Sequence, residues 1–180
     1  MSQIKVNSLV PLGGLPSGAT GGGVIQTVHS TFDSAFSTTS TSAVDVGLSG
    51  TIEMQSASNK LLITCSVLWT SQSNIAYLYL ADGSNNIIQQ PPARGSRGRY
   101  HWGTHYNGDS ADDNEYHSAR ETFHCMHSPG ATGNFTVKLK CIVTNSGSSV
   151  TATVNRNFFD GDRINDPSGV STLTLMEISG

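Results

Sequence analysis

The most constraining feature of this sequence is a set of short segments in which apolar and polar residues alternate with a period of two. The clearest is KLLITCSVLWT, residues 60–70, whose apolar side consists of Leu61, Ile63, Cys65, Val67 and Trp69. Successive side chains of a β-strand point to opposite faces of a sheet, so this pattern is typical of a strand with one buried face. Turn-forming Gly, Ser, Asn and Asp residues separate the segments, and no long helical pattern interrupts them. The sequence therefore predicts an all-β fold.

From residue 24 onward the pattern predicts about eight to ten short strands. The turn sequence DGSNN, residues 82–86, predicts a hairpin, and Pro91-Pro92 should end strand pairing. Many short strands of this kind favour an antiparallel β-sandwich, with a jelly roll as the expected form. The predicted strands are residues 24–30, 36–46, 50–55, 60–70, 75–82, 87–90, 118–127, 134–144, 149–158 and 171–178.

Charge and composition narrow the class of protein. Only 13% of the 180 residues are charged, and the net charge of −3 gives no basic field for a phosphate backbone. No apolar run approaches the ~20 residues of a membrane-spanning helix, and the N-terminus lacks the order of a secretory signal. We expect a protein made in a cytoplasm that neither inserts into membranes nor takes nucleic acid as its main partner.

The N-terminal residues 1–23 differ from the rest. A short apolar stretch precedes GGLPSGATGGG, whose glycines are costly to order. We expect residues 1–23 to be an arm and linker, and residues 24–180 to be the β-sandwich domain. The arm is either a disordered tail or a docking peptide that orders on a partner. Its apolar side chains favour docking: Ile4, Val6, Leu9, Val10 and Leu12.

The three cysteines, Cys65, Cys125 and Cys141, each share a face with apolar neighbours. An odd count on apolar faces predicts buried, reduced thiols rather than a disulfide framework or a metal site.

The last ten residues, STLTLMEISG, form one of the most regular strand patterns. Leu173, Leu175 and Glu177 fall on one face, whereas Thr174, Met176 and Ile178 fall on the other. Because both faces carry apolar residues, we expect a strand covered on both sides. Glu177 should remain hydrated or pair with an arginine.

The stretch around RYHWGTHYNGD, residues 99–109, has the composition of a recognition loop. Aromatic rings stack on sugars and other rings, while arginines supply directed polar contacts. The alternative is that Trp102 and one tyrosine anchor the loop on the core. The candidate receptor- or glycan-binding residues are Arg97, Arg99, Tyr100, His101, Trp102, His105 and Tyr106.

The sequence contains no recognisable catalytic or cofactor motif. His124 and His127 should point to opposite faces of a strand and so cannot chelate one ion together. The acidic runs at 109–115 and 158–169 are typical of solvated loops. Nucleophile-elbow and phosphate-loop motifs are missing. We therefore expect a non-enzymatic protein without a cofactor; a histidine from each subunit on a threefold axis is the one metal arrangement left open.

Three stretches resemble small tail-fibre or fibre-like virion proteins of tailed bacteriophages, of the marine cyanophage type. They are VNSLVPLGGLPSGATGGGVIQ at the start, FSTTSTSAVDVGLSGTIEMQSASNKLLITCSV in the first body strands, and VTATVNRNFFDGD with GVSTLTLMEISG at the end. The resemblance leaves about residues 84–130 unmatched. None of these stretches is catalytic.

The resemblance implies a virion structural protein, made in the host cytoplasm and assembled as a homotrimer. Its arm would dock on other virion proteins, and its outer loops would contact a host-surface glycan or protein, as in a tail-fibre tip. A head-attached fibre or capsid decoration protein needs the same parts. The closing strand would then contribute the trimer core, through Leu173, Leu175, Met176 and Ile178.

Two other classes are open alternatives. A free carbohydrate-binding module would be monomeric and carry a stacked aromatic platform. A small glycan-cleaving enzyme would need two carboxylates about 5–9.5 Å apart.

Overall fold

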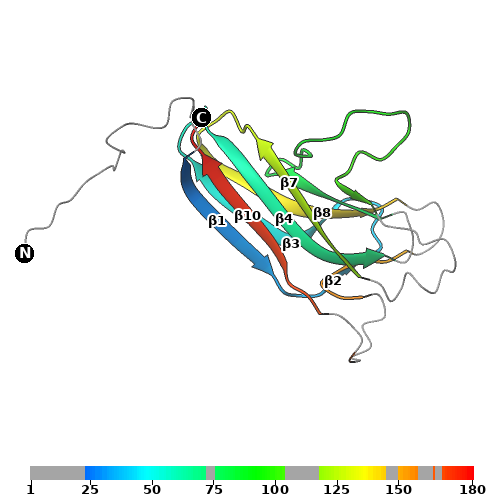
Figure 1. Cartoon of the computed structure of the whole chain (residues 1–180). Helices are drawn as coiled ribbons and strands as arrows, with labels where there is room; N and C mark the ends of the chain where they lie inside the picture. Colours follow the sequence, from blue (N-terminus) through cyan, green and yellow to red (C-terminus); the bar gives the residue numbers. More distant parts are fainter. Residues whose placement is uncertain (1–22, 72–75, 104–117, 145–149, 158–163, 165–167) are drawn as a thin grey trace, which may run out of the picture.

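The computed structural model describes residues 23–71, 76–103, 118–144, 150–157, 164 and 168–180. Their regular structure consists entirely of strands, arranged in two antiparallel sheets that pack face to face (Figure 1). The all-β sandwich predicted from the sequence is confirmed. The strands are β1 (Val24–Phe32), β2 (Phe36–Thr38), β3 (Val44–Met54), β4 (Lys60–Ser71), β5 (Ala76–Asp82), β6 (Trp102–Gly103), β7 (Ala119–His127), β8 (Gly133–Val143), β9 (Ala152–Val154) and β10 (Ser171–Ile178).

The strand order is that of a jelly roll. The first sheet, sheet A, contains β1, β2, β4, β7, β9 and β10; the second, sheet B, has the order β3–β8–β5–β6. Trp69 of β4 pairs with both β7 and β9, so these two strands flank β4 on opposite sides. β10 and β7 pair with the same residues of β4, so they must lie along opposite edges of that strand. β10 therefore lies along the same edge of β4 as β9. Sheet A is therefore four strands wide, because β9 lies end to end with β10 beside β4, and β2 pairs with β9. Sheet B also has four strands, and the chain crosses repeatedly between the two sheets.

The core lies between the sheets and is built from the apolar sides of the alternating patterns. Cys65 and Cys141 are fully buried within it, Cys125 is half-buried, and all three are free thiols. Burial raises the pKa of Cys65 and of Cys141 to about 12, and that of Cys125 to about 11. The prediction of buried free thiols is confirmed for Cys65 and Cys141, whereas Cys125, on the partly exposed strand β7, is only half-buried.

Several predicted strand boundaries differ from the structure. The predicted strand 36–46 is divided, because residues 39–43 between β2 and β3 do not form a strand, and among the described residues of the predicted strand 149–158 only Ala152–Val154 forms one, β9. β3 continues unbroken through residues 47–49, because Gly47 adopts a φ of 109° in a bulge that keeps Leu48 buried. Residues 87–90, predicted to be a strand, make only an isolated bridge between Ile87 and Ala81. The intervening turn is set by Asp82, whose carboxylate accepts hydrogen bonds from the backbone of residues 84 and 86.

The closing strand β10 lies between β1 and β4, inside sheet A. Leu173 and Leu175 face the core and are fully buried within a single chain, whereas Met176 and Ile178 lie half-exposed on the opposite side. One face of β10 is therefore covered by the core, whereas the covering of its other face that the sequence predicted is not present within a single chain. Strand pairing with β1 and β4 holds both edges of β10.

The expectation for Glu177 was wrong, because the end of β10 is covered by amide donors instead of water or a cation. The carboxylate is fully buried and accepts hydrogen bonds from Gln26 Nε2 at 2.6 Å, Asn59 Nδ2 at 2.6 Å and the Gln55 backbone at 2.8 Å. Burial acts to raise the pKa of Glu177, but these hydrogen bonds and one from the backbone of Ser56 outweigh it and hold the pKa below its ordinary value.

Candidate binding surfaces

The outward-facing side chains of β1, β10, β4 and β7 form one continuous surface, called here the outer face of sheet A. Strand register sets its rows: Thr27, Met176, Leu62 and Met126 stand opposite one another across the four strands. The next row is His29, Thr174, Thr64 and His124, and the row after it is Thr31, Thr172, Ser66 and Thr122.

This face is poor in charge and rich in exposed apolar area. Met126 is 48% exposed and Val24 58%, and it is a contiguous apolar patch, not a scattered apolar residue, that marks an interaction site. The outward-facing strand residues include no carboxylate. Their permanent charges, Lys60 and Arg120, lie at opposite ends of the sheet, because they pair with opposite ends of the β10–β4–β7 rows. An uncharged centre with charges at the margin is the usual composition of a protein interface.

The two histidines of this face lie at its two edges. His29 Nδ1 is 2.9 Å from Thr174 Oγ1. On β7, His124 points outward and His127 points inward toward Phe135, as the strand spacing predicted. Within the described ranges no three His, Cys, Asp or Glu side chains gather as a metal site would require.

On the other sheet, the segment before and within β6 carries the predicted recognition residues. Trp102 is only 7% exposed and belongs to the core cluster. Tyr100 packs against Tyr77, with ring centroids 4.7 Å apart, and against Tyr79 at 5.5 Å, in both cases with the ring planes tilted by about 30°. These two residues therefore fit the anchoring interpretation, since they fix the segment to sheet B and the core.

His101 joins the two sheets. The Leu80 backbone N–H donates to its Nδ1 at 3.1 Å, so Nε2 carries the proton and donates to the Ile88 carbonyl at 2.7 Å. Its ring stacks on Phe123 of sheet A, with centroids 4.1 Å apart and planes within 5°. Burial lowers the pKa of His101, and the bond to Ile88 only partly offsets this effect. With both ring nitrogens engaged, His101 has a structural role.

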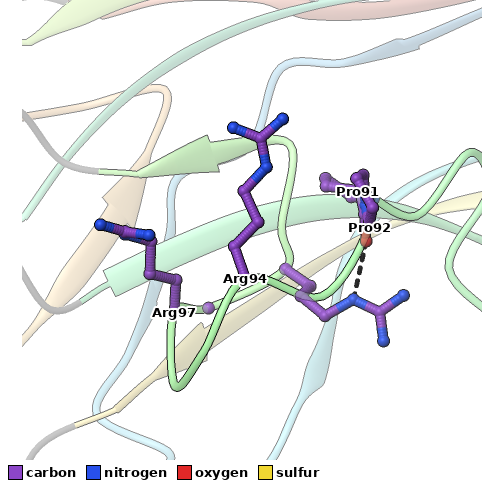
Figure 2. Close-up of a pocket in the computed structure, with 6 residues that line it drawn as sticks. Pro91, Pro92, Arg94 and Arg97 are labelled. Carbon is purple, nitrogen blue, oxygen red and sulfur yellow. Dashed lines mark hydrogen bonds between the residues drawn. The ribbon is translucent and has the colours of Figure 1, made fainter.

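The arginines of the same segment do face solvent. Arg94 and Arg97 are exposed, and Arg99 donates from Nε to the Pro91 carbonyl at 2.7 Å. Together with Pro92 and Gly98, they line a shallow hollow of about 250 Å³ (Figure 2). Arg94 was not among the sequence candidates; the run R-G-S-R-G-R, separated from Pro91-Pro92 only by Ala93, is the sequence signal that could have identified it.

Several predicted residues lie outside the described residues. These are the attachment candidates Ile4, Val6, Leu9, Val10 and Leu12, the loop candidates His105 and Tyr106, the acidic run at 109–115, and residues 158–163 and 165–167 of the run at 158–169. Among the residues that the structure does describe, no helix has the length and apolarity to cross a membrane.

Comparison with known proteins gives little further guidance. A scan against family models and a search of curated proteins found no match. Among solved structures, the chain is similar to one from "Structure of infectious bursal disease virus Gx strain", with 11% identity and a TM-score of 0.34. The match covers 87% of this chain but only 40% of that one.

Proposed function

We propose that this protein is a virion structural protein of a tailed phage, a homotrimeric tail-fibre or receptor-binding tip. The N-terminal arm docks on the particle, and the β-sandwich presents the segment 91–99 to the host surface. The proposal of a virion protein and of three copies rests on the resemblance at both ends of the chain. Self-association rests on the outer face of sheet A, which is the single structural observation that carries it.

The composition of this face suits contact with a second copy of the chain. Met176 and Leu62 stand opposite each other at its centre, half-exposed, and Met126 extends the apolar row to the edge strand β7. Burying such side chains against another copy removes apolar area from water, and it leaves no carboxylate buried without a partner, because the outward-facing strand residues include none. The Thr and Ser hydroxyl groups in the neighbouring rows can exchange their hydrogen bonds to water for hydrogen bonds to the other copy.

A recognition surface on the opposite layer agrees with this orientation. Tyr100 packs on tyrosines of sheet B, so the arginines of the 91–99 segment remain accessible when the outer face of sheet A is covered. Three copies would then present three such segments, and weak contacts would add through avidity.

Labelling intact particles with antibody against this protein tests the proposal. Label at the tail tip is the expected result, whereas label over the head would assign the same parts to a head fibre or decoration protein. Particles without label, together with a monomeric protein in solution, would contradict the proposal and favour a free carbohydrate-binding module.

A further inference from the structure

We propose that the segment Pro91–Arg99 binds a polyanionic glycan, a linear polysaccharide that carries carboxylate or sulfate groups at repeated positions. The inference deepens the proposed function and rests on it for its biological setting, because it names the ligand class of the recognition segment. It restricts the site to Arg94, Arg97 and Arg99, and leaves out His101 and Trp102.

Charge is the first observation. Three of the ten lysines and arginines of the chain lie within six residues, in a protein whose net charge is −3. No carboxylate lines the hollow, and the side chains of Arg94 and Arg97 make no ion pair or hydrogen bond with any described residue. Guanidinium groups that no described carboxylate neutralises suit the carboxylate or sulfate groups of a ligand, which they can bind in bidentate fashion.

Rigidity is the second observation. The bond from Arg99 Nε to the Pro91 carbonyl closes the segment on itself and leaves the two terminal amino groups of Arg99 for a ligand. Pro91 and Pro92 restrict the backbone on one side of the hollow. On the other side, packing of the Tyr100 ring against Tyr77 fixes the residue after Arg99. A segment held in this way loses little conformational entropy when it binds.

Direction is the third observation, and it selects a polymer over a small ion. Figure 2 shows the side chains of Arg94 and Arg97 leaving the ribbon in different directions. Two guanidinium groups that point in different directions cannot both bind one small anion, but they can bind successive anionic groups along a polymer.

Nucleic acid is a poorer fit than a glycan. Tight binding to its dense phosphate backbone typically uses about 6–10 cationic contacts, and the net charge of the whole protein opposes it. A polysaccharide with one anionic group per sugar or per disaccharide demands fewer cations.

The experiment measures binding of the full chain to immobilised dextran sulfate, polygalacturonate, neutral dextran and double-stranded DNA. The double variant Arg94→Gln/Arg97→Gln is compared with Lys138→Gln/Arg163→Gln, which removes two positive charges elsewhere in the sequence and likewise changes the net charge from −3 to −5. We expect the first variant to lose about ten-fold or more in affinity for an anionic polysaccharide and the second to change less than about two-fold. Binding should also weaken as salt rises.

Preference for dextran sulfate or for polygalacturonate identifies the anion as sulfate or carboxylate, and either result supports the proposal. Equal losses in both double variants, equal binding to neutral dextran, or no binding to any polymer would overturn it. Stronger binding to DNA would overturn it in favour of nucleic acid. The oligomeric state and the position on the particle are measured separately, so a monomer that still binds through these arginines would refute the proposed assembly alone.

Discussion

The side chain of Asn59 donates a hydrogen bond to the carboxylate of Glu177 over 2.6 Å, although the two residues are 118 positions apart in the chain. Asn59 Oδ1 in turn accepts a hydrogen bond from the backbone of Gly180 at 3.2 Å. Gln26 reaches the same carboxylate from β1. The first strand, the turn before β4 and the C-terminus are thus joined at one buried group.

Replacing Glu177 with Gln should destabilise the fold. The carboxylate accepts from four donors, and an amide at that place turns its NH₂ group toward some of them. We expect the free energy of unfolding to fall by about 3 kcal/mol, measured by chemical denaturation. Glu53→Gln, on an exposed face of β3, is the matched control and should change little. Equal stability of the two variants would show that the buried carboxylate contributes nothing.

The stability of the wild type and that of Glu177→Gln should also respond differently to acid. Because hydrogen bonding holds the folded pKa of Glu177 below its ordinary 4.5, its stabilising effect is complete above that pH and is lost as pH falls through the folded pKa. The stability difference between the wild type and Glu177→Gln should therefore shrink on acidification below about pH 4.5. A difference that stays constant down to strongly acidic pH would contradict this account.

His101 should make stability depend on pH in the range nearer neutrality. Burial holds its folded pKa below the ordinary 6.5, so the unfolded chain takes up the proton first and stability is lost as pH falls below 6.5. His101→Gln keeps an acceptor for Leu80 and a donor for Ile88 but does not titrate. Between about pH 7.5 and about pH 5.5, denaturation midpoints of the variant should decline less steeply than those of the wild type. Parallel declines would assign the titration to another group, such as His127.

Asn155 should be a strong determinant of stability at the opposite end of sheet A. It is 2% exposed, has a φ of 63°, donates to the carbonyls of Phe32 and Ser34, and accepts from Ser171 Oγ at 2.6 Å. Asn155→Ala should lower the free energy of unfolding by about 3 kcal/mol. Asn85→Ala removes an exposed asparagine at a similar φ of 68°, whose side chain accepts one hydrogen bond from Lys140 Nζ at 2.9 Å, so it reproduces the backbone cost with the loss of that one contact. Similar losses in the two variants would locate the effect in the backbone.

Local patterns were enough to predict the sandwich, because burial between two sheets imposes the alternation seen in residues 60–70 and 171–178. The same rule predicted the opposite directions of His124 and His127. It failed at Glu177, because the donors on Gln26 and Asn59 come from distant parts of the chain and leave no periodic signal. Arg94 was missed although it belongs to the run R-G-S-R-G-R, because only the structure shows that the Arg99–Pro91 bond closes the segment and that Arg94 lines the resulting hollow.

The central claim is that copies of this chain cover the outer face of sheet A, and sedimentation equilibrium tests it most directly. The wild type should have three times the chain mass of 19.0 kDa. Met176→Lys, at the centre of that face, should give a folded monomer, because a charge there would be buried without a partner. Thr51→Lys, exposed on sheet B, should stay trimeric. A wild-type protein that sediments as a monomer, or a Met176→Lys variant that remains trimeric, would contradict the account.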